Sequence, residues 1–103
     1  SPRTAEVLHA IVQAYIETGE PVASRIIARR RRDQISPATI RNIMADLADE
    51  GYLDQPHTSA GRVPTAKAFR HFAESLAAHR LLANELTRLR SDLNQLQDRK
   101  SVV

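Results

Sequence analysis

The residues best suited to a chemical function are Arg41 and Asn42, two neighbouring polar side chains in the middle of the chain. Arginine forms paired hydrogen bonds with the edge of guanine, and asparagine does the same with adenine. Ala38 and Thr39 lie one turn earlier, and Ser36 precedes the segment. These residues predict contact with the bases or phosphates of double-stranded DNA. For Thr39, the alternatives are a phosphate contact, contact with a thymine methyl group, and support of a helix cap.

Arginines are dense in the stretch that contains these residues. Residues 21–45 carry six arginines and one acidic residue, whereas residues 46–60 carry four acidic residues and neither lysine nor arginine. Residues 61–80 are basic again, and the whole chain has a formal charge of +3. Such polarity suits a face that lies on a phosphate backbone, although an arginine-rich solvated surface has the same composition. The arginines expected to contact phosphate are Arg25, Arg31 and Arg32.

A second group of candidate residues lies in a turn-rich stretch, residues 55–61. His57 and Thr58 can donate hydrogen bonds to phosphate, or they can hold the backbone of their own loop. Arg62, just after the loop, is expected to contact phosphate or to enter the minor groove, and the alternative is an arginine at a strand edge.

Other kinds of chemistry find no support in the sequence. The chain has no cysteine, only three glycines, and four histidines without the spacing of metal ligands. No nucleophile has an evident partner base, so we expect neither an enzyme nor a bound metal or cofactor. No apolar run approaches the roughly 18 residues of a membrane span, and no signal peptide opens the chain, which favours a cytoplasmic protein without a membrane partner.

The elements that must position these residues are mostly helices. Apolar residues at helical spacing predict a helix over 4–18, ended by Gly19, and Ser36 followed by Pro37 predicts the start of another over about 37–50. A shorter helix near Ser24 lies between them, and a fourth helix begins after Pro64. The residues expected to face inward are Val7, Leu8, Ile11, Val12, Tyr15, Ile16, Ile26, Ile27, Ile40, Ile43, Met44, Leu47, Phe69, Phe72, Ala73 and Leu76.

Short strands are expected at 52–53 and 62–63, on either side of the turn-rich stretch. The order of elements is then helix, helix, helix, strand, loop, strand, helix. This order indicates a mainly α fold, a winged helix-turn-helix made of a three-helix bundle and a small β-hairpin wing. In such a fold the third helix enters the major groove. We expect residues 1–76 to form this DNA-binding domain.

The remaining segment, residues 77–103, is expected to form an amphipathic helix. Its leucines recur at spacings of 4, 3, 4 and 3, which is the seam of a coiled coil about two heptads long: Leu82, Leu86, Leu89, Leu93 and Leu96. Such a seam can pair with a second copy of the chain, or it can pack on a region that this chain lacks. We favour a homodimer, because helix-turn-helix dimers bind operators whose two half-sites mirror the two-fold symmetry of the protein.

Three strings of sequence resemble the HrcA family. They are SPATIRN at 36–42 with MADL at 44–47, QPHTSAGRVPT at 55–65, and the turn that includes GEPV at 19–22. The resemblance covers residues 4–76. It implies a bacterial heat-shock repressor that binds the CIRCE inverted repeat upstream of chaperone operons, occupies the promoter, and responds to the GroE chaperonin.

The sequence also departs from the family. Ala23 and Ala68 stand where glycine is expected in many members, and Phe69 stands in place of a more usual tyrosine. The chain ends before the GAF-like region that follows the winged helix in the family. Two classes of rival function stay open at this point. One is a winged helix that binds RNA or proteins, or that regulates other genes. The other is an assembly module in which the leucine seam matters most.

Overall fold

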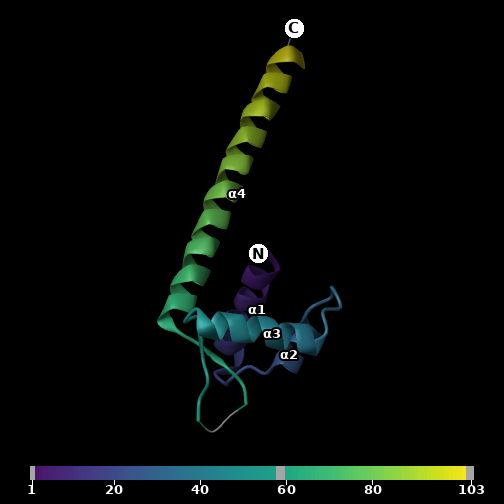
Figure 1. Cartoon of the computed structure of the whole chain (residues 1–103). Helices are drawn as coiled ribbons and strands as arrows, with labels where there is room; N and C mark the ends of the chain where they lie inside the picture. Colours follow the sequence, from purple (N-terminus) through teal and green to yellow (C-terminus); the bar gives the residue numbers. More distant parts are fainter. Residues whose placement is uncertain (1, 58–59, 102–103) are drawn as a thin grey trace. The chain divides into compact units, whose positions relative to one another are not determined.

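The computed structural model describes residues 2–57 and 60–101 and contains four helices and one β-hairpin (Figure 1). The helices are α1 (Pro2–Thr18), α2 (Ser24–Arg30), α3 (Pro37–Asp49) and α4 (Ala66–Ser101), and the strands are β1 (Leu53–Asp54) and β2 (Val63–Pro64). This order and composition confirm the predicted winged helix-turn-helix with a C-terminal helix. The chain divides into two compact units, residues 1–72 and residues 73–103.

The core of the first unit is aliphatic, as the scarcity of aromatic residues requires. Helices α1, α2 and α3 pack on one another, and α1 and α3 also pack on the hairpin strands. No polar or charged side chain is buried among the described residues. The buried residues are Val7, Leu8, Ile11, Val12, Ala14, Val22, Ile27, Ile35, Ile40, Met44, Leu47, Leu53 and Ala68.

Five residues that were predicted to face inward are exposed instead: Ile16, Ile26, Phe69, Ala73 and Leu76. The buried face of α4 was predicted one position too late in the sequence. The face of α4 that packs on the first unit contains Ala68, which is fully buried, with His71 and Phe72 half-buried. These residues follow the i, i+3, i+4 spacing of one helical face. Phe69 lies at the edge of this face, with its ring centroid 6.2 Å from that of Tyr15, and Ala73 is exposed.

The predicted helix ends are confirmed. Gly19 ends α1 in the left-handed conformation, with φ +70°, and its N–H donates to the carbonyl of Tyr15 at 2.7 Å. Gly51 follows α3 with φ +84°. Glycine adopts this region without the steric penalty that a Cβ imposes. Gln34, in the turn before α3, also has a positive φ of +58°.

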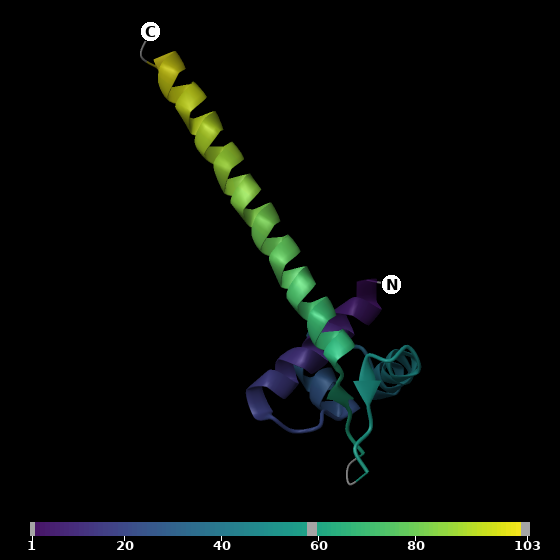
Figure 2. The same ribbon diagram turned by 90° about the vertical axis from the view of Figure 1, so that its left-hand side faces the viewer.

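The hairpin strands each begin one residue later than predicted. They pair antiparallel, with Leu53 opposite Pro64 and Asp54 opposite Val63. Tyr52 is not in β1, because its N–H donates to the carbonyl of Leu47 in the turn that ends α3. Both views show the hairpin extending past the helices of its own unit (Figures 1 and 2).

The second unit is the remainder of α4. Every described side chain from Leu76 to Arg99 is exposed, including the five leucines of the seam, each more than half exposed. None of the helices in the described residues is long and apolar enough to span a membrane.

Candidate nucleic-acid interface

The start of α3 is held by a complete N-cap. The Oγ of Ser36 accepts a hydrogen bond from the N–H of Thr39 at 3.1 Å, and Pro37 occupies the first helical turn. The Ser36 hydroxyl also lies 3.0 Å from the Oγ1 of Thr39. The predicted capping role of Ser36 is therefore confirmed, and the Thr39 hydroxyl takes part in the same cap. The cap satisfies an N–H that the helix itself leaves unpaired.

The exposed face of α3 separates the candidate residues into two groups. The helix buries Ile40, Met44 and Leu47, and successive residues point about 100° apart. Ala38 and Asn42 therefore point almost directly away from the core. Arg41 lies on one flank of the exposed face and Thr39 on the other, and all four side chains are exposed.

Arg41 shares a pocket with Arg62, which comes from the hairpin. The pocket has a volume of about 240 Å³ and lies between the start of α2, the flank of α3 and the hairpin. Its lining residues are Ala23, Ser24, Arg41, Met44, Ala60 and Arg62. Both arginines are candidates from the sequence, where they are far apart, and only the folded chain brings them together.

The hairpin is attached to the segment before α2 by backbone contacts. The N–H of Val22 donates to the carbonyl of Arg62 at 2.8 Å, and the N–H of Arg62 donates to the carbonyl of Val22 at 3.0 Å. A Cβ at Gly61 would lie 2.9 Å from the carbonyl carbon of Pro21, so only glycine fits there without displacement. Sequence analysis missed this role of Gly61, because its signal was only a glycine at the end of a loop.

The other hairpin candidates are placed in part. The Arg62 guanidinium donates through Nη1 to the carbonyl of Ala60 at 3.0 Å, so the side chain follows the base of the loop. His57 is exposed. Thr58, the remaining candidate in this loop, lies outside the described residues.

Arg31 is engaged in contacts within the protein. Its guanidinium forms an ion pair with Glu6 of α1 at 2.8 Å and another with Asp33 in the following turn, and its side chain is only 13 % exposed. The hydrogen bonds with Asp33 and then Glu6 raise the pKa of Arg31, and the same contact with Arg31 lowers the pKa of Asp33. This geometry indicates that Arg31 connects α1 to the turn before α3.

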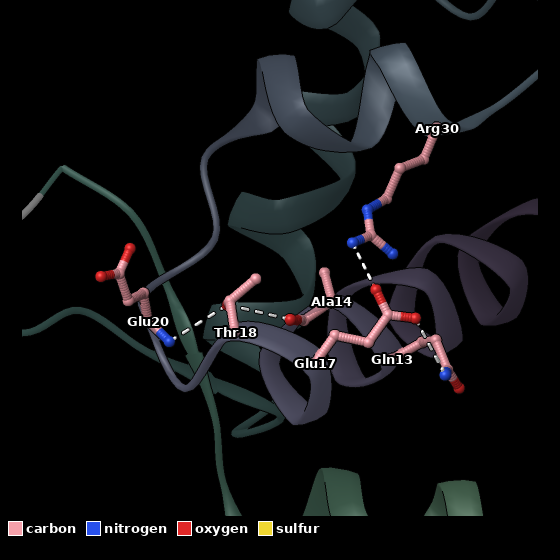
Figure 3. Close-up of polar contacts among 6 residues, drawn as sticks. All are labelled: Gln13, Ala14, Glu17, Thr18, Glu20 and Arg30. Carbon is pink, nitrogen blue, oxygen red and sulfur yellow. Dashed lines mark hydrogen bonds and ion pairs between the residues drawn. The ribbon is translucent and has the colours of Figure 1, made fainter.

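Arg30 is also paired inside the first unit. Its Nη2 lies 2.5 Å from Oε2 of Glu17, and this hydrogen bond lowers the pKa of the Glu17 carboxyl (Figure 3). Figure 3 also shows the end of α1, where Thr18 donates to the carbonyl of Ala14 at 3.0 Å. Arg25 and Arg32 are exposed, and neither forms an ion pair within the described part of the chain.

Within residues 2–57 and 60–101, no group of three potential metal ligands gathers. One pair of histidines is in contact, with Nε2 of His9 lying 3.1 Å from Nδ1 of His71. Their rings also contact Phe72 and Tyr52, respectively. This pair connects α1 to the start of α4 and therefore serves packing in the first unit.

Comparison with known proteins places this arrangement in a family. A family profile described as "Winged helix-turn-helix transcription repressor, HrcA DNA-binding" matches residues 1–77. Two similar curated proteins are named heat-inducible transcription repressor HrcA. The one from Thermodesulfovibrio yellowstonii is 48% identical over 91% of this chain and 31% of its own length, and the one from Streptomyces albus G is 49% identical over 100% and 31%. These names describe regulators rather than enzymes.

A solved structure shares the fold as well. It is a crystal structure of a hypothetical protein at 2.2 Å resolution, 44% identical, with a TM-score of 0.73 over 76% of this chain and 24% of that one. The chain spans about a third of the length of the two curated relatives from Thermodesulfovibrio yellowstonii and Streptomyces albus G. The profile match, the sequence identities and the shared fold agree, and the chain belongs to the HrcA family of winged helix-turn-helix proteins.

Proposed function

We propose that this chain binds double-stranded DNA in a sequence-specific manner, as the DNA-binding part of a transcription repressor. The observation that carries the proposal is the exposed N-terminal half of α3, in a domain that belongs to the HrcA family. A capped helix start presents Ala38 and Asn42 away from the core, and in helix-turn-helix proteins the N-terminal residues of this helix contact the base edges.

Each candidate residue has a proposed role at this surface. Asn42 reads an adenine edge, and Ala38 leaves room for close approach or contacts a thymine methyl group. Thr39 and Ser36 maintain the helix cap and bring the first N–H groups of α3 toward phosphate. Exposed Arg25 and Arg32 contact the backbone beside the groove, and His57 and Thr58 contact it from the hairpin. Arg31 is excluded from the proposed contacts because Glu6 and Asp33 already occupy its guanidinium.

The proposed target is an inverted repeat of the CIRCE type. The resemblance implies this operator, and the relatives are named heat-inducible repressors. Repression would follow from occupation of a promoter in the cytoplasm, and control by the GroE chaperonin is a further implication of the resemblance. An inverted repeat presents two equivalent half-sites, so the proposal includes two copies of the chain.

The second unit supports a homodimer. The described side chains from Leu76 to Arg99 are exposed, and packing of an apolar face supplies most of the stability of protein helices. If Leu86 and Leu93 take the first core position of the heptad, Glu85 and Arg90 flank the seam. In a parallel pair these opposite charges face each other, whereas an antiparallel pair brings acidic residues together. We therefore propose a parallel, in-register pair.

Fluorescence anisotropy with labelled duplexes tests the proposed function. We expect this chain to prefer a CIRCE duplex to a scrambled duplex of equal length, with a shallower salt dependence on CIRCE, because specific binding gains contacts besides phosphates. Asn42→Ala should lower that preference about tenfold, since one bidentate base contact contributes about 1–3 kcal/mol of discrimination. Asn94→Ala, the same change at an exposed position of α4, is the matched control. Equal binding of both duplexes, or stronger binding of a matched RNA, would contradict the proposal.

A further inference from the structure

The pocket shared by Arg41 and Arg62 has the chemistry of a site for one unit of a sugar–phosphate backbone. Two arginines from different elements line it, together with Ser24. The remaining lining residues, Ala23, Met44 and Ala60, are apolar. A phosphodiester in DNA is an anion flanked by apolar deoxyribose carbons, so charged and apolar walls in one pocket match its two parts. Arginine is the side chain best shaped to hold phosphate oxygens.

The charge in this pocket is not neutralised by the protein. No acidic residue lines the pocket, and Arg41 forms no ion pair in the described part of the chain. Arg30 and Arg31, by contrast, are both paired with carboxylates. Arg41 is therefore available to an external anion. In the most basic run of the sequence, residues 29–32, Arg30 and Arg31 instead connect helices of the first unit.

The position of Arg41 on α3 separates it from the residues that read bases. Arg41 and Met44, three residues apart, line the pocket on the flank of the helix, while Ala38 and Asn42 point outward. A side chain on the flank beside the hairpin faces the wall of a groove, where the backbone runs. A side chain on the outward face meets the base edges at the floor of the groove.

Contacts within the protein hold the walls of the pocket in place. Two backbone hydrogen bonds between Val22 and Arg62 fix the hairpin against the segment before α2. Close packing of Gly61 on Pro21 fixes the same junction. The bond from the Arg62 guanidinium to the Ala60 carbonyl orients the side chain at the pocket. A preformed site loses little conformational entropy when it binds.

We propose that this pocket seats a single backbone phosphodiester of the operator, held jointly by Arg41 and Arg62, and that Arg41 contacts phosphate and does not read a base. This inference rests on the proposed DNA binding. It assigns sequence recognition to Asn42 and its neighbours on the outward face of α3. The junction of α2, α3 and the hairpin then fixes the register of the domain on the duplex.

Arginine variants measured against both duplexes test the assignment. Arg41→Ala is expected to weaken binding to the CIRCE and scrambled duplexes by the same factor, about tenfold, because phosphate contacts act alike on all sequences. Arg62→Ala and Arg62→Gln should do the same, and the glutamine keeps a donor for the Ala60 carbonyl. The double variant should lower the log–log salt slope by about 0.9 rather than about 1.8 for each bound copy of the chain, since both arginines of one copy neutralise one phosphate. Arg80→Ala, at an exposed site on α4, is the control for loss of one charge.

A scan of the operator with single methylphosphonates locates the shared phosphate. Neutralising one position should weaken binding of the unaltered chain about tenfold and leave binding of the double variant unchanged. The scan is run with inorganic phosphate absent and then present in excess. A tenfold effect that excess phosphate removes supports the shared site, because the free anion then competes with the backbone for it. The absence of any sensitive position in both conditions would overturn the assignment to the backbone.

The outcomes separate this inference from the proposed function. No preference of the unaltered chain for the CIRCE duplex would contradict the function itself. A preference that disappears in Arg41→Ala while overall affinity persists would show that Arg41 reads a base and would overturn the inference alone. A slope change near 1.8 for each bound copy of the double variant, or two separate sensitive phosphates within one half-site, would also overturn it. Thermal unfolding by circular dichroism confirms that each variant is folded.

Discussion

Arg31, at the end of α2, and Asp33, in the turn that follows, are joined through two hydrogen bonds. The Nε of Arg31 donates to Oδ1 of Asp33 at 3.1 Å, and Nη2 donates to Oδ2. Nη2 also reaches Glu6 of α1 at 2.8 Å. One guanidinium therefore connects the first helix to the turn that aims α3. The neighbouring Arg32, of the same residue type, is exposed.

Arg31 and Arg32 should respond differently to the same substitution. Arg31→Ala is expected to lower the free energy of unfolding by about 1 kcal/mol, because it leaves two carboxylates without their donor. Arg32→Ala should leave stability within about 0.5 kcal/mol and reduce the salt dependence of DNA binding. Urea unfolding and anisotropy measure the two effects. Equal loss of stability in both variants would contradict the structural role assigned to Arg31.

Asp33 should make the free energy of unfolding depend on pH in the acid range. The hydrogen bond from Arg31 lowers the pKa of Asp33 in the folded chain, so the folded state holds fewer protons than the unfolded state near the ordinary pKa of 3.8. The stabilisation is then complete above about pH 4 and is lost as the pH falls through the lower folded pKa. Urea unfolding between pH 7 and pH 2 should show a smaller acid loss in Asp33→Asn than in the unaltered chain. Asp98→Asn, on the second unit, provides a comparison, and identical acid profiles for Asp33→Asn and the unaltered chain would refute the assignment.

Gly61 should tolerate no side chain at the junction of the hairpin. A Cβ there would lie 2.9 Å from the carbonyl carbon of Pro21 and 3.0 Å from the backbone nitrogen of Val22, so the backbone must shift. Gly61→Ala is expected to lower the free energy of unfolding by about 1–3 kcal/mol, the usual cost of overpacking, and to weaken DNA binding. Gln55→Ala, an exposed change next to the hairpin, is the matched control. Unfolding and binding curves for Gly61→Ala that overlay those of the unaltered chain would contradict the contact.

The leucine seam should make the chain dimerise, and the charges that flank it should favour the parallel arrangement. Sedimentation equilibrium is expected to show a monomer–dimer equilibrium that Leu89→Asn shifts toward monomer, because a polar residue in the core of a short coiled coil costs stability. Glu85→Arg alone should also weaken the dimer, and Glu85→Arg with Arg90→Glu should restore it. Failure of the second charge reversal to restore dimerisation would exclude the parallel arrangement. Arg80→Glu changes charge outside the seam and serves as the control.

Local signals in the sequence were enough for the elements of the fold. Gly19, the pair Ser36–Pro37 and the apolar spacing of α3 act within a few residues, so the helix ends and the buried face of α3 follow from them and are confirmed. The winged helix-turn-helix and the family resemblance are confirmed in the same way. The roles of the candidate DNA-contacting residues stay predictions.

The tertiary structure decided what depends on residues that are distant in sequence. Arg31 and Arg32 look alike in the sequence, and only the packing of α1 beside the turn brings Glu6 to Arg31. Arg41 and Arg62 were separate candidates, and only the contact between Val22 and Arg62 places them in one pocket. The buried face of α4 was predicted one position off. The helical period fixes only the spacing of the buried residues, whereas the neighbouring elements determine which face they cover. The residue types thus determined which side chains suit DNA, and packing determined which of them are available to meet it.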